Sequence, residues 1–263
     1  MSELKIVDTI KRSFNLLKKD PALIVLFIPP AIFSLLYQRI TNYLSDLMFL
    51  RIMEDIGSDA SPLPPMLPVL LLILSFVIGF FFGVWASAAA ILKVTELEKG
   101  RKLGLREALS RGLRKVPKLL VPAVISLAIF VLTIASLATV YTNYPFLLLG
   151  TGPSVIVLQV AVGCLFVIGL YVLIRLYLYS PACVLENTFG LETSWKLTKG
   201  NWWKLLAIFL IFRALSVFIK AAYIVGPFLS GVIVGPFSVA VMTLIYFQLK
   251  EGASSREEHK ESL

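Results

Sequence analysis

The fold of this chain is decided by one stretch, Phe189-Gly190-Leu191-Glu192-Thr193-Ser194-Trp195-Lys196-Leu197-Thr198-Lys199-Gly200-Asn201-Trp202-Trp203-Lys204-Leu205-Leu206. Its first part is amphipathic, it breaks at Gly200-Asn201, and a Trp-Trp-Lys step leads into a long, mostly apolar run. This order is typical of a helix that lies on a membrane surface and is followed by a helix that enters the membrane. We therefore expect a surface helix over Phe189–Lys199 and a membrane span that begins at Trp202.

The same design occurs twice more along the chain. Leu103–Lys115 is a basic, amphipathic segment that precedes an apolar run, and so is Ile6–Lys19. In the latter, Ile6, Ile10, Phe14 and Leu17 recur at helical spacing, which predicts that these four side chains share the apolar face of the helix. The chain therefore begins each of three parts with a predicted surface helix.

The three parts can be aligned residue by residue. Ser13 aligns with Ser194, and Gly104 aligns with Gly190. If each part is a surface helix followed by two spans, all three enter the membrane from the same side and are parallel repeats about an axis along the membrane normal. Chance agreement among amphipathic segments is the alternative, because few identities support the alignment. The predicted repeats cover about residues 1–94, 95–181 and 182–250 of a single membrane domain.

Composition supports an all-α integral membrane protein. The residues are 58% hydrophobic and 16% charged, and the mean hydropathy is +0.86, well above that of a soluble domain. Apolar runs of at least ~18 residues recur, as membrane-spanning helices require. Six spans are predicted, at about Pro21–Tyr43, Leu67–Val94, Leu119–Tyr141, Ser154–Ser180, Trp202–Val225 and Phe228–Lys250.

Lysine and arginine predict the orientation. They gather before the first span, in Lys93–Lys118, in Lys196–Lys204 and in the tail, whereas the other side holds only Arg39, Arg51 and Lys220. The positive-inside rule then places both termini in the cytoplasm of a multi-pass protein of the cell membrane. Anionic lipid headgroups account for the net charge of +9, so nucleic acid is not expected as a partner. The charged tail 251–263 is predicted to be disordered.

Two further patterns predict local packing. Pro29-Pro30 falls inside the first span and should kink it, because two successive prolines remove two backbone donors. Gly79, Gly83 and Ser87 recur every fourth position in the second span, next to a run of alanines. Small residues at this spacing allow helices to approach closely, so we expect this face to pack inward.

The deciding stretch also carries a resemblance. Glu186, Gly190-Leu191 and the run Ser194–Trp203 resemble the recurring signature of a broad prokaryotic group of six-span membrane proteins, mostly of unassigned function. The group includes the membrane domain found beside glycerophosphodiester phosphodiesterases. The resemblance covers Pro181–Leu206 closely and the rest of the chain only in architecture. No phosphodiesterase domain is recognised here, so the resemblance implies a membrane-embedded accessory or lipid-handling domain rather than that activity.

The residues for catalysis are few. The chain has one histidine, His259, which lies in the tail, and none of its sixteen acidic residues falls deep within a predicted span. Hydrolytic or metal chemistry needs a nucleophile with a base, paired carboxylates or metal ligands. Cys164 and Cys183 do not form a pattern that predicts a disulfide or a thiolate metal site. We expect no enzyme activity, no metal and no cofactor.

Arg213 is the exception among the span residues, because it falls in the middle of the fifth span. An arginine at that depth costs several kcal/mol unless it is paired or hydrated. It is either a structural arginine that bonds helix carbonyls or the contact for an anionic headgroup in an internal cavity. The predicted interfacial lipid contacts are Arg111, Arg114, Lys115, Trp195, Lys199, Trp202, Trp203 and Lys204.

These patterns favour a non-catalytic membrane protein that interacts with lipids or serves as an accessory or scaffold protein. The alternative is a transporter or permease subunit for a lipid or amphiphile, which a continuous polar lining would favour. Membrane lipids are the expected partners. Protein partners and the oligomeric state stay open.

Overall fold

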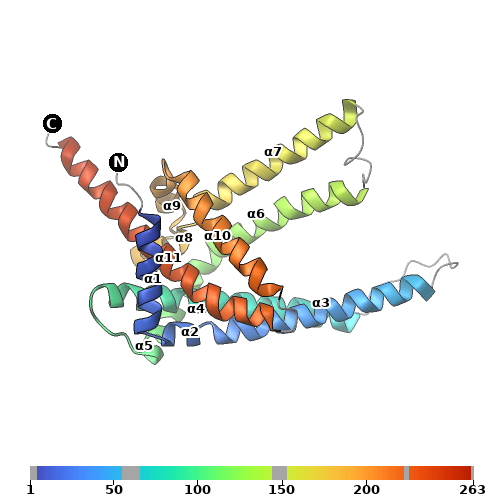
Figure 1. Cartoon of the computed structure of the whole chain (residues 1–263), viewed down its shortest axis with the longest axis horizontal. Coiled ribbons are helices and arrows are strands. Elements are labelled where there is room, and N and C mark those ends of the chain that lie inside the picture. The colour runs from blue at the N-terminus through green and yellow to red at the C-terminus, as the bar shows by residue number, and fades with distance from the viewer. Residues whose placement is uncertain (1–4, 55–65, 144–152, 222–224, 262–263) are drawn as a thin grey trace. The chain divides into compact units, whose positions relative to one another are not determined.

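Eleven helices make up the regular structure of the described residues, which are 5–54, 66–143, 153–221 and 225–261 of a computed structural model (Figure 1). No strand occurs within these four ranges. The helices are α1 (Ile6–Lys19), α2 (Ala22–Val25), α3 (Ile28–Glu54), α4 (Met66–Glu98), α5 (Leu105–Leu113), α6 (Val116–Asn143), α7 (Pro153–Arg175), α8 (Tyr179–Glu186), α9 (Leu191–Thr198), α10 (Trp202–Lys220) and α11 (Gly226–Glu261).

Six helical segments among the described residues are long and apolar enough to cross a membrane, which indicates a multi-pass membrane protein and confirms the predicted number of spans. These segments are Ala22–Leu47, Met66–Glu98, Val116–Ala135, Gln159–Glu186, Trp202–Lys220 and Gly226–Ser254.

The predicted proline kink in the first span is confirmed. A turn at Leu26 and Phe27 separates α2 from α3, and Pro29 and Pro30 follow in the first turn of α3. The first turn of a helix has no intrahelical partner for its N–H groups, so proline loses little there. The break therefore lies just before the prolines.

The C-terminal tail differs from the prediction. Residues 251–261 continue α11 as helix instead of forming a disordered segment. The tail contains four glutamates together with one alanine, one arginine and one lysine, which are good helix formers, and no proline follows Pro236. Helix propensity therefore extends the sixth span beyond its apolar part.

The chain divides into two units, each built from separated segments. Unit 1 comprises residues 1–6, 115–209 and 242–263, and unit 2 comprises residues 7–114 and 210–241. Helices α10 and α11 each contribute one part to either unit.

In unit 2, α3 lies along α4, and α5 packs on the C-terminal part of α4. The buried alanines Ala86 and Ala88–Ala90 form the contact region, and an added Cβ at Gly112 would lie 2.9 Å from the Ala89 nitrogen. At Gly79 the added Cβ would lie 3.0 Å from Phe33 Cβ on α3. Small residues of the predicted inward face therefore contact α3 and α5. Gly83 does not take part, because nothing lies within 4 Å of a Cβ atom added there.

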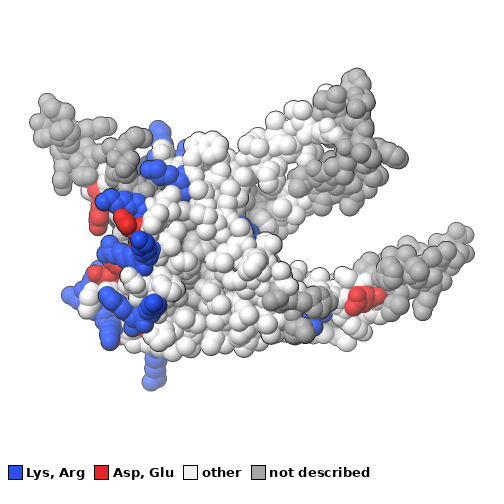
Figure 2. Space-filling view, viewed as in Figure 1, with Lys and Arg blue, Asp and Glu red and all other residues white. Residues whose placement is uncertain are grey.

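Helix α1 packs on the protein through a face other than its predicted apolar face. Thr9, Ser13 and Leu16 are its buried residues, whereas Phe14 is 53% exposed. Small side chains allow α1 to lie close to its neighbours, which displaces the larger apolar residues from the contact. Exposed lysines and arginines lie on the same helix as Phe14. Figure 2 shows lysine and arginine side chains gathered over α1 and α5.

In unit 1, α6 and α7 lie side by side (Figure 1), and α9 packs on both α7 and α8. Gly169 of α7 is buried against Thr133 of α6, where an added Cβ would lie 2.3 Å from Thr133 Oγ1. The α6–α7 pair therefore depends on a close approach of the two backbones. Helix α8 was not predicted, because the fourth span was expected to end at Ser180. Pro181 instead lies in the first turn of α8, where proline is tolerated.

Candidate functional site

The turn from α8 to α9 is set by two residues with positive φ. Asn187 has φ 60° and ends α8, and Gly190 has φ 68° and begins α9. Gly190 is also enclosed, because an added Cβ would lie 2.5 Å from the Tyr179 carbonyl oxygen and 2.6 Å from the Cys183 nitrogen. Only glycine meets both conditions without strain. The glycine of the deciding stretch thus fixes how α9 returns onto α8.

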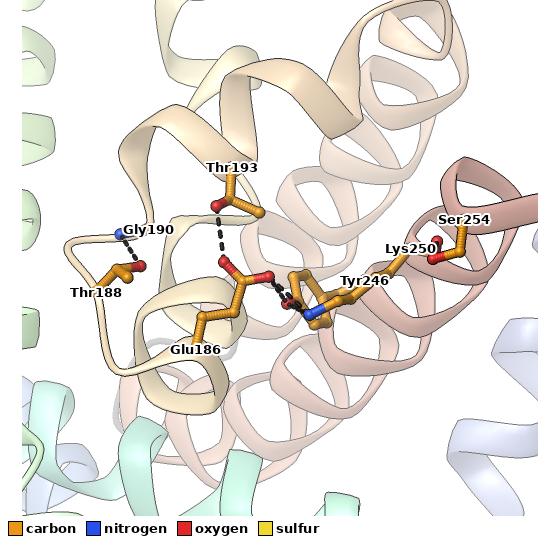
Figure 3. A network of polar contacts seen from close by, with 7 residues as sticks. All are labelled: Glu186, Thr188, Gly190, Thr193, Tyr246, Lys250 and Ser254. Carbon is orange, nitrogen blue, oxygen red and sulfur yellow. Dashed lines mark hydrogen bonds and ion pairs between the residues drawn. The ribbon is translucent and has the colours of Figure 1, made fainter. Parts of the chain in front are cut away.

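Glu186 connects this turn to α11 (Figure 3). Its Oε2 accepts a hydrogen bond from the Thr193 hydroxyl at 2.7 Å, and its Oε1 accepts one from the Tyr246 hydroxyl at 2.7 Å. Lys250 Nζ also donates to Oε1 at 2.8 Å and forms an ion pair with it. The carboxylate is 22% exposed, so both oxygens are occupied in a partly desolvated place. Charge-assisted hydrogen bonds of this kind are stronger than neutral ones.

Helix α9 is bonded to the end of α7 through small hydroxyl side chains. The Ser194 hydroxyl donates to the Arg175 carbonyl oxygen at 2.7 Å and accepts from the Leu178 N–H at 3.1 Å. Thr198 donates to the Ser194 carbonyl oxygen at 2.9 Å. These bonds satisfy backbone groups where α7 ends, and they place α9 beside the last turn of α7.

Two aromatic rings lie against Arg175 in unit 1 and two more adjoin them, and we call Tyr171, Arg175, Trp195, Trp202 and Trp203 the Arg175 cluster. The guanidinium carbon lies 5.1 Å from the Tyr171 ring centroid and 5.2 Å from that of Trp195. The Trp202 ring lies 5.8 Å from Tyr171 and 4.5 Å from Trp203, measured between centroids. Cation–π contacts and aromatic packing thus hold the arginine in one orientation.

The structure brings together part of the predicted lipid-contact set. Trp195, Trp202 and Trp203 lie in the Arg175 cluster, and Lys199 ends α9 next to it with an exposed side chain. Lys204 is half-buried in α10. Lys115 instead donates to the Asn187 side-chain oxygen at 3.1 Å, so part of its hydrogen-bonding capacity is used within the protein.

The remaining predicted contacts belong to unit 2. Arg111 and Arg114 are exposed at the end of α5, where Arg111 forms an ion pair with Glu107. Arg213 lies midway along α10 with an exposed side chain, not enclosed as the internal-cavity prediction required. Whether it contacts an anionic headgroup stays a prediction.

Two polar connections were not predicted. In unit 2, Lys93 is 3% exposed, forms an ion pair with Asp20 and donates to the Leu103 carbonyl oxygen at 2.7 Å. In unit 1, Glu186 was part of the quoted signature, but no role was assigned to it. Both involve partners more than sixty residues apart, Asp20 with Lys93 and Glu186 with Lys250, and a single sequence carries no signal for such pairs.

The described residues hold no group of three or more His, Cys, Asp and Glu side chains that could bind a metal ion. The described cysteines are both free, with Cys164 exposed and Cys183 buried. The Arg175 cluster in unit 1 combines hydrogen-bond donors with aromatic rings.

Comparison with known proteins shows a family but no function. No curated protein and no solved structure matches the chain. No link to the membrane domains found beside glycerophosphodiester phosphodiesterases is shown, so that resemblance stays a prediction. One family, described as "Domain of unknown function (DUF7847)", matches residues 4–249, and this protein belongs to that family.

Proposed function

We propose that this protein is a non-catalytic, lipid-interacting protein of the cell membrane. In this proposal α1, α5 and α9 lie on the cytoplasmic leaflet, and both termini are cytoplasmic. The single histidine of the chain is in keeping with a non-catalytic role. Incubation of the protein with phosphatidylglycerol vesicles should release no hydrolysis product, and enzyme-dependent release would contradict this part of the proposal.

The observation that carries the proposal is the outward face of α1. The helix buries Thr9 and Ser13, while Val7 is 63% exposed and Phe14 is 53% exposed. Lys18 Nζ lies 4.8 Å from the Phe14 ring centroid. An apolar face that the fold leaves uncovered, with cations beside it, is the arrangement by which amphipathic helices bind a membrane surface.

The other two short helices repeat this arrangement. Helix α5 buries Ala108 and Gly112 and leaves Leu113 47% exposed beside Arg111. Helix α9 buries Ser194 and leaves Trp195 42% exposed. In each helix the small residues serve the contact with the protein, so the large apolar residues are available to lipid.

The same residues support the proposal of three parallel repeats. Ser13, Ala108 and Ser194 occupy aligned positions, and each is 0% exposed. Two of the repeats share a further feature. In each, a basic residue near the end of one span donates a hydrogen bond to a backbone carbonyl of the surface segment that follows. Lys93 donates to the Leu103 carbonyl oxygen, and Arg175 donates to that of Trp195. Common burial and common bonding favour a shared architecture over chance similarity.

The test is the affinity of the purified protein for anionic lipid. Native mass spectrometry would compare phosphatidylglycerol with phosphatidylcholine for the wild type and for the double variant Arg111→Gln/Arg114→Gln. Each cation near an anionic surface contributes about 1 kcal/mol, so we expect roughly fivefold weaker phosphatidylglycerol binding per charge removed. High salt should reduce the preference for phosphatidylglycerol in the wild type.

Arg39→Gln is the matched control. Arg39 is exposed on α3, and its place in the chain puts it on the predicted opposite side of the membrane. This variant should keep the affinity of the wild type for phosphatidylglycerol. The proposal is wrong if the wild type shows no preference for phosphatidylglycerol, or if the double variant binds it as tightly as the wild type does.

A further inference from the structure

The hydrogen bonds of Arg175 hold its guanidinium without using all of its donors. Nε and Nη2 both donate to the Tyr171 hydroxyl, at 3.0 and 2.7 Å, and Nη1 donates to the Trp195 carbonyl oxygen at 3.2 Å. A guanidinium carries five N–H groups. Among the residues that the structure describes, these bonds therefore leave one N–H on Nη1 and one on Nη2 for a further acceptor.

A second donor of the Arg175 cluster also lacks an acceptor. The indole Nε1 of Trp202 is buried and has no hydrogen-bond partner in the described part of the chain. A buried N–H without a partner is unfavourable. An acceptor from outside the chain would remove this penalty once side-chain movement exposes the N–H. Trp202 packs on Tyr171, whose hydroxyl accepts from Arg175, so an anionic acceptor is the most favourable one.

The Arg175 cluster has exposed rings that a lipid can contact, and it lies at the ends of apolar helices. Trp195 is 42% exposed and Trp203 is 75% exposed, so the rings are not enclosed by protein. Arg175 ends α7, and Trp202 begins α10, both at ends of apolar helices. Tryptophan and tyrosine at such ends lie at the headgroup level of a bilayer, which is where lipid phosphates are found.

We infer that the Arg175 cluster binds the phosphate group of a membrane phospholipid. The inference rests on the proposed lipid interaction and adds a defined site to it. The planar guanidinium binds phosphate oxygens with its remaining N–H groups, and the exposed rings pack against the glycerol and the first methylene groups of the lipid. Tyr171 is a positioning residue, because its hydroxyl orients the guanidinium.

The test measures the dissociation constant of the first bound phosphatidylglycerol, using delipidated full-length protein in detergent and native mass spectrometry. Arg175→Lys keeps the charge but loses the planar fork, so we expect about tenfold weaker binding. Trp202→Phe keeps a ring but removes the indole N–H, and we expect weaker binding by several-fold. Phe166→Leu changes an exposed ring on α7 outside the cluster and should leave the dissociation constant unchanged.

Because Arg175 also bonds the Trp195 carbonyl oxygen, Arg175→Lys could unfold α9. Thermal unfolding of each variant checks this, and Trp202→Phe tests the site without removing that bond. The inference is overturned if Trp202→Phe and a folded Arg175→Lys both bind phosphatidylglycerol like the wild type. If the preference for phosphatidylglycerol and its salt dependence persist in that case, the proposed function stands and only the defined site fails.

Two further probes identify the source of the phosphate. Diacylglycerol has the same acyl chains without a phosphate and should show no binding that depends on Arg175. Inorganic phosphate should not displace phosphatidylglycerol at equal concentration, since it lacks the apolar part. Equal binding of diacylglycerol, or displacement by inorganic phosphate, would contradict a phospholipid site.

Discussion

At the scale of single residues, the deciding stretch contains two glycines with positive φ that differ in their surroundings. Gly190 has φ +68° and is enclosed by the Tyr179 carbonyl and the Cys183 nitrogen, whereas Gly200 has φ +86° and nothing within 4 Å of an added Cβ. The left-handed conformation alone explains glycine at position 200. At position 190 glycine is required for a second reason, because the return of α9 onto α8 leaves no room for a Cβ atom.

This difference gives a test of the turn. Gly190→Ala should destabilise the protein by about 2–5 kcal/mol, of which roughly 1–2 comes from the left-handed conformation and the rest from the steric conflict. Gly200→Ala should lose only the first contribution. The measurement is the midpoint of thermal unfolding in detergent for both variants. Equal midpoints would show that the contacts around Gly190 do not constrain the turn.

Glu186 supports a second prediction at this scale. Glu186→Gln removes the ion pair with Lys250 and weakens the hydrogen bonds from Tyr246 and Thr193, so we expect a loss of about 1–3 kcal/mol. Glu192→Gln is the control, because Glu192 forms an exposed ion pair with Lys196 that contributes little. Thermal unfolding should separate the two variants. A stability of Glu186→Gln equal to that of the wild type would contradict a role for Glu186 in joining α9 to α11.

At the scale of the elements, helical periodicity and glycine breaks were enough to predict α1, α5 and α9, and all three are helical. The predicted apolar face of α1 does not form its contact with the protein, because apolar spacing identifies an amphipathic helix but not which side touches protein. In a membrane protein the large apolar residues can face lipid while small residues form the protein contact. Thr9 and Ser13, spaced by four residues, carried the relevant signal.

Lys93 gives the prediction at this scale, because it joins three elements. It lies on α4, pairs with Asp20 before α2, and bonds the Leu103 carbonyl oxygen before α5. Lys93→Met should destabilise the protein by about 3–5 kcal/mol, because the carboxylate of Asp20 is left without its partner. Lys99→Met removes an exposed pair with Glu96 and should change stability little. The thermal unfolding midpoints of both variants check this, and a midpoint of Lys93→Met close to that of Lys99→Met would contradict it.

At the scale of the whole molecule, the length and apolarity of the runs were sufficient to predict six spans. The candidate site was predicted in part. The tryptophans were recognisable as interface residues from the Trp-Trp-Lys step. The position of Arg175 among them depends on α9 folding back onto α7, and that return is determined by Gly190 and Ser194 contacts that do not appear as a pattern in one sequence.

The orientation of the molecule is the last prediction. Lysine and arginine asymmetry predicts that both termini are cytoplasmic. In a background with Cys164 and Cys183 replaced by alanine, single cysteines at positions 57 and 144 should react with a membrane-impermeant maleimide added to intact cells. Those at positions 100 and 256 should react only after permeabilisation. Positions 57 and 144 lie outside the described residues, whereas Gly100 is exposed after the end of α4. Labelling of position 100 in intact cells would reverse the orientation, and it would place α5 and its arginines on the outer leaflet.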